Sequence, residues 1–154
     1  MERLKQKLII EQLDKKIDKF KTLENIETPS EGWTCSIRTA VRMSLRQLGQ
    51  RLNISAQGAK TIEKREKDGS LTLKGLIEIG KALDMKFVYG FIPKTGSIEK
   101  MVQNKATEVA NEIVLRTSKS MSLEDQEVSD DRLKQAIKDR TDEILYKMPR
   151  YLWD

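Results

Sequence analysis

The sequence contains no histidine and only one cysteine, Cys35, in 154 residues. Histidine is the commonest general base near neutral pH and the commonest metal ligand, so its absence weakens most hypotheses of catalysis or metal binding. A single cysteine cannot form an internal disulfide, and we expect it to be a small core residue. The sequence also lacks a glycine-rich phosphate loop and metal-ligand spacing. We therefore expect no enzyme activity, no cofactor and no metal site.

Long apolar runs are missing as well. The longest, such as residues 87–92, fall far short of the roughly 20 residues that span a bilayer. The N-terminus lacks a basic region followed by an apolar stretch, which is the pattern of a secretion signal. We therefore expect a soluble, cytoplasmic protein with no membrane partner.

The net charge of +5 arises in one stretch of the chain. Residues 33–65 hold seven basic residues and one acidic residue, a local charge of +6, whereas the rest of the chain nearly balances. A concentrated basic surface on a near-neutral chain is what attraction to phosphate requires. A solvated helical surface is the alternative that charge alone leaves open.

Hydrophobic periodicity predicts a mainly α-helical chain in three parts. Residues 1–31 are expected to form a helical arm, with a helix over residues 2–23, and a linker. Residues 32–96 are expected to form a central domain, and residues 97–154 a C-terminal helical region in which the serine- and acid-rich stretch 118–131 is a loop. The other expected helices cover residues 33–41, 45–52, 56–65, 73–83, 98–117 and 131–146. N-cap hydroxyls are expected at Ser44, Ser55, Thr72 and Ser97.

Residues 85–92 have a different composition from the expected helices, because aromatic and β-branched residues dominate them. Phe87, Tyr89 and Phe91 alternate onto one face, which predicts a β-strand at the end of the central domain. A single strand leaves its backbone groups unpaired, and pairing with the same strand of a second copy would form a symmetric dimer. An extended segment packed on the helices is the alternative.

Residues 44–63 have the spacing of a helix-turn-helix. Leu48 and Leu52 provide the apolar face of the first helix, and Gly49 leaves room where the two helices cross. Asn53 tolerates the left-handed conformation that the turn requires. The second helix, residues 56–65, is then the predicted recognition helix, whose first turns enter the DNA major groove.

The residues predicted to face DNA have suitable chemistry. Gln57 can pair with adenine or reach guanine, and the Thr61 methyl can contact a thymine methyl. The predicted base-contacting residues are Ser55, Ala56, Gln57, Gly58, Lys60 and Thr61. The predicted phosphate-contacting residues, which set register without reading sequence, are Arg42, Arg46, Gln47, Lys64 and Arg65. An ordinary helical hairpin with a solvated basic face is the competing interpretation.

Residues 45–63, with helices before and after them, resemble the Cro and phage-repressor type of helix-turn-helix, the XRE family. The chain is also similar, over most of its length, to the bacterial mobile mystery protein A family. The residues that carry this resemblance are Gly32-Trp33, residues 43–48, Glu63 followed by Gly69 and residues 71–73, residues 89–93 and the closing residues 152–154. The resemblance implies a five-helix, lambda-repressor-like domain with one strand and additional terminal helices. It also implies an antitoxin-like autorepressor, usually encoded beside a Fic-domain partner, mobile mystery protein B.

Inhibition of Fic enzymes uses a helix bearing Ser or Thr, three residues, Glu, then Gly or Asn. The nearest match is Ser120 with Glu124, where Asp125 replaces the last residue and the predicted structure is a loop. If this chain silences a toxin, other candidate surfaces are the helix over residues 98–117, the tail at Trp153 and the N-terminal arm.

Two functional hypotheses follow. The first is a dimeric regulator that binds double-stranded DNA at a pseudo-palindromic operator. The alternative is a protein-interaction antitoxin that mainly binds and inhibits a Fic-domain toxin. The separation of a basic centre from amphipathic flanks lets both hold in one chain.

Overall fold

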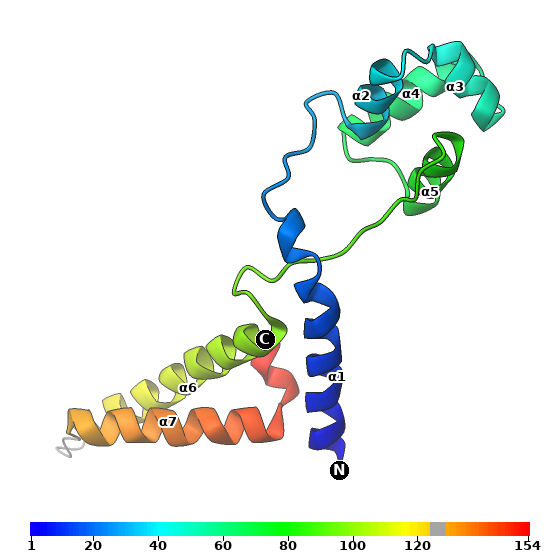
Figure 1. Cartoon of the computed structure of the whole chain (residues 1–154). Helices are drawn as coiled ribbons and strands as arrows, with labels where there is room; N and C mark the ends of the chain where they lie inside the picture. Colours follow the sequence, from blue (N-terminus) through cyan, green and yellow to red (C-terminus); the bar gives the residue numbers. More distant parts are fainter. Residues whose placement is uncertain (124–128) are drawn as a thin grey trace. The chain divides into compact units, whose positions relative to one another are not determined.

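The computed structural model describes residues 1–123 and 129–154, and these residues are mainly helical, as the periodicity predicted. They divide into two compact units, which are described separately below (Figure 1). The central unit is Asn25–Tyr89, and the terminal unit combines Met1–Glu24 with Gly90–Asp154. No helix in the described part of the chain is both long enough and apolar enough to cross a membrane.

The central unit consists of four α-helices, α2 (Trp33–Ala40), α3 (Leu45–Leu52), α4 (Ala56–Lys67) and α5 (Leu73–Ala82). The residue pattern predicted these four, whereas the family resemblance implied five, and the unit contains no fifth helix. Its buried centre is formed by Leu48, Ala59 and Ala82, with the partly buried Met43, Leu45, Leu52 and Leu83 around them.

Three of these helices begin at the hydroxyl caps that the sequence predicted. Ser44, Ser55 and Thr72 each accept a hydrogen bond from the backbone N–H three residues later, at 3.1, 3.0 and 3.0 Å. Ser44 also forms a capping box, in which its own N–H donates to the Gln47 side chain at 2.8 Å. Each cap satisfies an amide that the first helical turn leaves without a partner.

The four helices of the central unit also end in one common way. A residue with positive φ follows each helix, and the next N–H donates to the carbonyl five residues earlier, over 2.7–2.9 Å. The four residues with positive φ are Arg42, Asn53, Gly69 and Asp84. The left-handed conformation predicted for Asn53 is confirmed, with φ 55° and ψ 41°.

The predicted strand at residues 85–92 is wrong. These residues adopt no regular secondary structure, and the described part of the chain contains no strand. Alternation does produce one stacked pair, Phe87 and Tyr89, whose ring centroids lie 5.9 Å apart. Tyr89 and Phe91 remain 61% and 85% exposed. The alternating pattern therefore places two rings side by side, but a strand also requires a neighbouring ladder.

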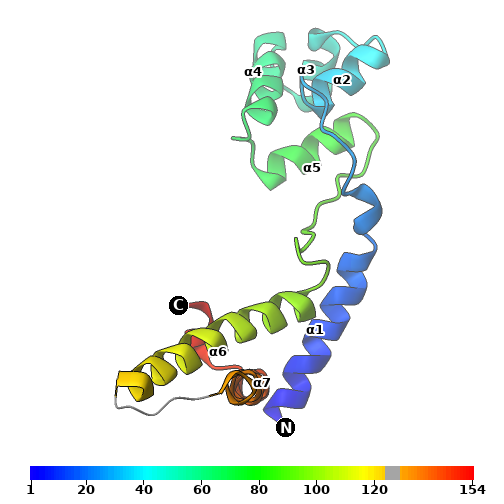
Figure 2. The ribbon, with the colours of Figure 1, turned by 90° about the vertical axis from the view of Figure 1, so that its left-hand side faces the viewer.

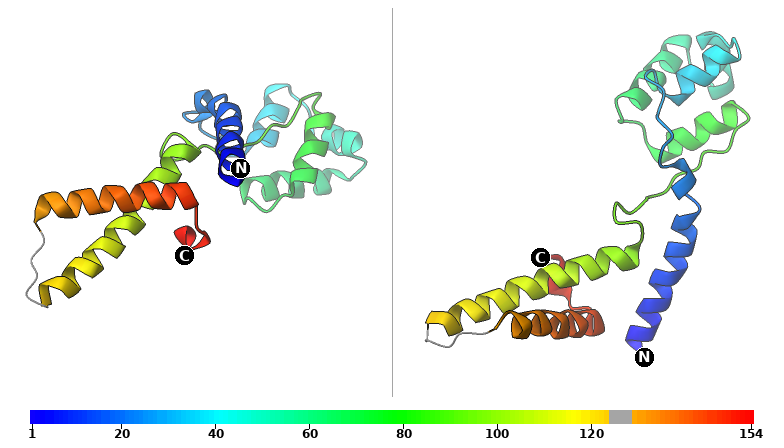
Figure 3. Two further views of the ribbon diagram at one scale, coloured as in Figure 1. Left: turned by 90° about the horizontal axis from the view of Figure 1, so that it is seen from below. Right: turned by 60° about the vertical axis from the view of Figure 1, so that its left-hand side comes forward.

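In the terminal unit, α6 (Ile98–Leu123) and α7 (Asp130–Lys147) pack side by side as a helical hairpin (Figures 2 and 3). A short 3₁₀ helix, η2 (Arg150–Trp153), packs back on α6. The core residues are Val102, Ala106, Ala110, Ile144 and Leu152. The C-terminal tail thus docks through the fully buried Leu152, whereas Trp153 stays 54% exposed.

Helix α6 continues beyond the predicted end at residue 117, so the predicted loop is wrong for residues 118–123. Polar residues were expected to stop the helix. Instead, the hydroxyls of Thr117 and Ser120 donate to the carbonyls of Ile113 and Arg116, at 3.0 and 3.2 Å. Serine and threonine can satisfy their hydroxyl donors in this way without leaving the helix.

The N-terminal helix α1 (Glu2–Asp18) is followed by a 3₁₀ turn, η1 (Lys21–Leu23), in place of one continuous helix. Asp14 joins α1 to α6, because its carboxylate accepts hydrogen bonds from the N–H groups of Ile98 and Glu99, at 2.7 and 3.2 Å. The predicted cap Ser97 accepts from the N–H of Lys100 at 3.0 Å. A carboxylate from a distant helix and a local hydroxyl thus share the amides at the start of α6.

Candidate nucleic-acid interface

The turn between α3 and α4 depends on Gly49, which lies in α3 and is buried. A Cβ atom at this position would lie 2.7 Å from the carbonyl oxygen of Ile54 and 2.9 Å from that of Ser55. Glycine therefore allows the backbone of α3 to approach the turn. The sequence predicted that Gly49 makes room at the crossing of the two helices, and the structure places the close approach at the turn itself. Asn53 and Ser55 then reverse the chain and cap α4, so that three residues join the two helices.

The predicted base-contacting residues lie together at the start of α4. Five of them, Ser55, Ala56, Gln57, Lys60 and Thr61, are exposed, and Gly58 is half-buried. The Ser55 hydroxyl accepts from the Gly58 amide, and the Thr61 hydroxyl donates to the Gln57 carbonyl at 3.0 Å. Within the described residues, the side chains of Gln57 and Lys60 form no hydrogen bond or ion pair, so their polar groups face solvent.

The opposite side of α4 is fixed to the unit. Ala59 is fully buried, and the nearly buried Glu63 carboxylate is paired with the Arg38 guanidinium of α2. Arg38 donates to Glu63 through Nε and, at 3.3 Å, through Nη2, while its Nη1 donates to the Met43 carbonyl at 2.9 Å. The hydrogen bond to Glu63 raises the pKa of Arg38 above its ordinary value. The pair therefore ties α4 to α2 through a bidentate contact.

A second carboxylate of α4 makes a contact that the sequence analysis missed. Glu66 accepts hydrogen bonds from the N–H groups of Trp33 and Thr34, at 2.8 and 3.0 Å, so it caps the start of α2. A carboxylate is favourable there because the first-turn amides carry partial positive charge. Gly32, with φ 85°, precedes these amides and brings the backbone to within contact of Glu66. The one sequence signal for this contact is that α2 begins at Trp33 after a glycine, without a hydroxyl residue at its N-cap.

The predicted phosphate-contacting residues are all exposed and come from three places. Arg42 lies in the connection between α2 and α3, Arg46 and Gln47 in the first turn of α3, and the other two, Lys64 and Arg65, near the end of α4. Among the described residues, none of the four basic side chains lies within 4.0 Å of a carboxylate. The Gln47 side chain, by contrast, already accepts from Ser44 in the capping box.

Two arginines of the basic stretch have internal roles instead. Arg38 is paired with Glu63, and Arg51 donates to the carbonyl of Ala82 at 3.0 Å and lies 3.5 Å from the Asp84 carboxylate. The charge that faces solvent is therefore smaller than the sequence count suggested. It is concentrated on the connection before α3, on α3 and on α4.

The remaining predicted site residues do not join this surface. Ser120 lies on α6 in the terminal unit, exposed and with its hydroxyl donating to the helix backbone, whereas Glu124 lies outside the described residues. Phe87, Tyr89 and Phe91, the predicted dimer strand, lie in the segment without regular secondary structure. In the described part of the chain, no three Cys, Asp or Glu side chains are grouped so that they could hold a metal ion.

Comparison of the chain with protein-family models, with curated proteins and with solved structures gives no match.

Proposed function

We propose that the chain is a sequence-specific DNA-binding regulator that reads bases through the start of α4. The observation that supports this most is the exposed surface of α4, where Gln57 and Lys60 have no internal partner while Ala59 and Glu63 fix the other side of the helix. A rigid helix with free polar groups at its first turns is what direct readout in the major groove needs. The lambda-repressor-like arrangement of the unit is part of the same proposal.

The residues at the start of α4 differ in what they can read. Gln57 offers both a donor and an acceptor, which suits the two adjacent groups of adenine. Lys60 offers a donor to a guanine edge. Ser55 and Thr61 have hydroxyls already engaged with the helix backbone, so Thr61 contributes mainly its methyl group. The small residues Ala56 and Gly58 allow the helix to come close to the bases.

The basic side chains around α4 are the proposed phosphate contacts. Arg42, Arg46, Lys64 and Arg65 are exposed and have no carboxylate partner among the described residues. Phosphate contacts supply affinity and orientation, whereas base contacts supply the discrimination between sequences. In this proposal the protein acts as a dimer at a pseudo-palindromic operator and represses its own gene.

Footprinting of the DNA upstream of the protein's own gene tests the proposal. The purified full chain should protect an inverted repeat whose half-sites are centred about one helical turn apart, roughly 10 base pairs. If it instead binds that DNA no more tightly than random duplex in the same salt, the proposal fails.

A second candidate function is a protein-interaction antitoxin that binds and inhibits a Fic-domain toxin similar to mobile mystery protein B. It is favoured by the apolar surface of α1. None of the residues of this helix is buried, and its apolar side chains Leu4, Leu8, Ile9 and Leu13 are 40–64% exposed. Exposed apolar side chains of this kind are a feature of interaction surfaces. Co-purification with the product of the neighbouring gene, reduced by Leu4→Ser and Leu8→Ser, would support it. A free chain that is unaffected by that product would count against it.

A further inference from the structure

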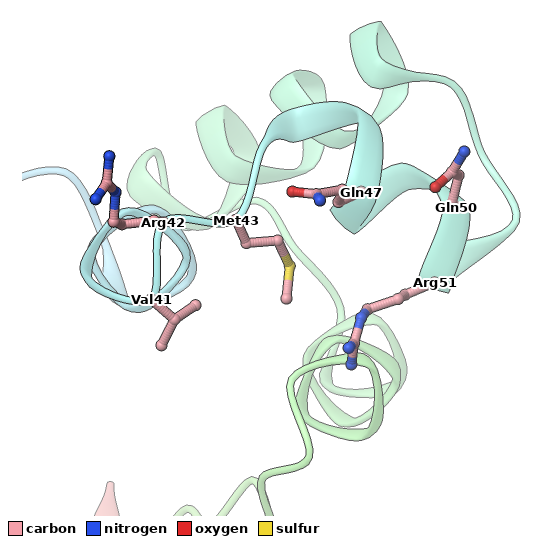
Figure 4. Close-up of a pocket in the computed structure, with 6 residues that line it drawn as sticks. All are labelled: Val41, Arg42, Met43, Gln47, Gln50 and Arg51. Carbon is pink, nitrogen blue, oxygen red and sulfur yellow. The ribbon is translucent and has the colours of Figure 1, made fainter.

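A groove of about 370 Å³ lies between α6 and α7 in the terminal unit. It differs from the hollow of about 470 Å³ beside α3 in the central unit, where the guanidinium groups of Arg42 and Arg51 point apart (Figure 4). There Arg51 is already bound to the Ala82 carbonyl, at 3.0 Å, and lies 3.5 Å from the Asp84 carboxylate. The groove between α6 and α7 instead joins apolar side chains of two helices.

The apolar part of this groove is open to solvent. Its residues are Ile113, Val114 and Met121 of α6 and Leu133 and Ala136 of α7. Met121 and Ala136 are exposed, and the other three are half-buried. Figure 3 (left) shows α6 and α7 separating toward the end of α6 and the start of α7. An open apolar groove between two helices suits another helix better than a small molecule, which needs an enclosing site.

The buried core of the terminal unit lies elsewhere along the hairpin. There η2 adds a third element, and its fully buried Leu152 belongs to the same cluster as Ala106 of α6 and Ile144 of α7. Over residues 111–121 of α6 and 130–143 of α7, by contrast, no side chain is buried. Two helices cannot cover their shared apolar surface alone, and helical hairpins do so by packing on further helices. This half of the hairpin therefore lacks the cover that η2 gives the other half.

The polar residues that line the groove include both signs of charge. Arg140 donates to Glu143 through Nη1 at 2.8 Å, and its other N–H groups form no hydrogen bond among the described residues. Asp139 accepts from the Gln135 side chain at 2.8 Å, and in the described part of the chain it has no cationic group within 4.0 Å. In a symmetric interface each patch meets its own copy, so the patch must carry both a donor and an acceptor. A carboxylate and a guanidinium with unused hydrogen-bonding capacity on one patch therefore favour a second copy of this chain as the partner.

We propose that two copies of the chain pair through this groove, with α6 and α7 of each copy forming a symmetric four-helix bundle. The apolar parts of the two grooves face each other. Asp139 of each copy pairs with the partner's Arg140. The inference goes beyond the proposed function, because it names the dimer surface that a pseudo-palindromic operator needs, and it rests on that function only where operator binding is concerned. Pairing in solution does not depend on DNA.

Sedimentation of the full chain over a range of concentrations is the first test. Wild-type protein should form a dimer that dissociates on dilution. Ala136→Glu should weaken self-association by about tenfold or more, because it buries an unpaired charge between the copies. Lys134→Glu is the matched control, since Lys134 is exposed on the same helix but does not line the groove, and it should leave the dimer intact.

Three results of this test overturn the proposal. The first is a wild-type chain that sediments as a monomer throughout. The second is a dimer that survives Ala136→Glu. The third is a chain that is monomeric alone and uses the groove to bind a different protein.

Mixing two charge variants tests the symmetric arrangement itself. Asp139→Arg brings two cations together at each contact and Arg140→Glu brings two anions together, so each variant alone should self-associate about tenfold or more weakly. An equimolar mixture restores both pairs of opposite charge and should recover the dimer. Asp142→Arg is the control, because it makes the same charge change outside the groove lining and should not affect pairing.

Folding of the two charge variants is checked by thermal unfolding. If both are folded and their mixture does not pair, the symmetric arrangement is wrong. If either fails to fold, the comparison of Ala136→Glu with Lys134→Glu decides the proposal.

Operator binding then separates this inference from the proposed function. If the chain pairs through the groove but binds operator and random duplex equally, the proposed function fails and the inference stands. If wild-type protein selects the operator and Ala136→Glu binds it equally well, the inference fails and the proposed function stands.

Discussion

The Arg38 guanidinium of α2 holds the Glu63 carboxylate of α4 through two hydrogen bonds and donates a third to the Met43 carbonyl. The two side chains are only 15% and 9% exposed, so the pair is largely removed from water. Glu63 follows the proposed reading residues on the same helix. The pair therefore sets the rotation of α4 about its own axis and thus which residues face solvent.

Replacement of Arg38 by methionine should lower the free energy of unfolding by about 2–4 kcal/mol, because it leaves the Glu63 carboxylate nearly buried and unpaired. The double variant Arg38→Met with Glu63→Leu should recover most of this loss, since no buried charge remains. Urea denaturation of the three proteins measures both effects. Equal losses in the single and double variants would contradict this account of the pair.

Gly49 makes a similarly specific prediction about the turn. In Gly49→Ala the new Cβ would lie 2.7 Å from a backbone oxygen, so the turn must move, and we expect a loss of about 1–3 kcal/mol. Gly75→Ala is the matched control, because there the nearest atoms belong to the Leu71 and Thr72 side chains, at 3.2–3.3 Å. It should change stability far less, since alanine also favours the helix. A Gly49→Ala protein as stable as Gly75→Ala would mean that the close approach is unimportant.

The sequence predicted features that depend on near neighbours. Ser44, Ser55 and Thr72 were identified as caps because an N-cap acts on amides two or three residues away. Asn53 was identified from the turn it must form. The same local reasoning found the buried Leu48 from its spacing.

The features it missed depend on residues far apart in the chain. Asp14 caps a helix that begins 84 residues later, and Glu66 caps one that begins 33 residues earlier. Nothing in either local pattern specifies such a partner. The predicted strand failed for a related reason, because alternation at Phe87 and Tyr89 places side chains side by side but specifies no neighbour for the backbone.

The contact of Asp14 with α6 predicts how α1 is attached. Asp14→Ala should expose the amides of Ile98 and Glu99, with a loss of about 0.5–2 kcal/mol, as for other N-caps. Hydrogen exchange of the Ile98 amide should accelerate by the corresponding factor. Asp18→Ala serves as the control, because Asp18 lies on the same helix but, among the described residues, forms its one ion pair with Lys21. If both variants exchange alike at Ile98, the cap does not join the two helices.

Glu143 predicts a dependence on pH in the terminal unit. Hydrogen bonds from Lys147 and Arg140 lower the pKa of Glu143 from 4.5 to about 2. Its carboxylate therefore contributes to stability above pH 4.5, and this contribution is lost as the pH falls toward 2. An NMR titration of the Glu143 carboxyl should give the lowered pKa, and Glu143→Gln should flatten the stability profile in this window. Asp142→Asn, the control on the neighbouring residue, should leave the stability profile unchanged. An ordinary pKa for Glu143 would refute the ion pairs.

The central claim is that α4 reads DNA sequence, and selection of binding sites from a random duplex pool tests it most directly. Wild-type protein should recover inverted half-sites, and Gln57→Ala should lose the preference at one position of each half-site, at a cost of about 1–3 kcal/mol. Lys64→Ala should instead recover the same sequences with uniformly weaker affinity. A wild-type pool without any shared sequence, or one that Gln57→Ala leaves unchanged, would contradict the claim.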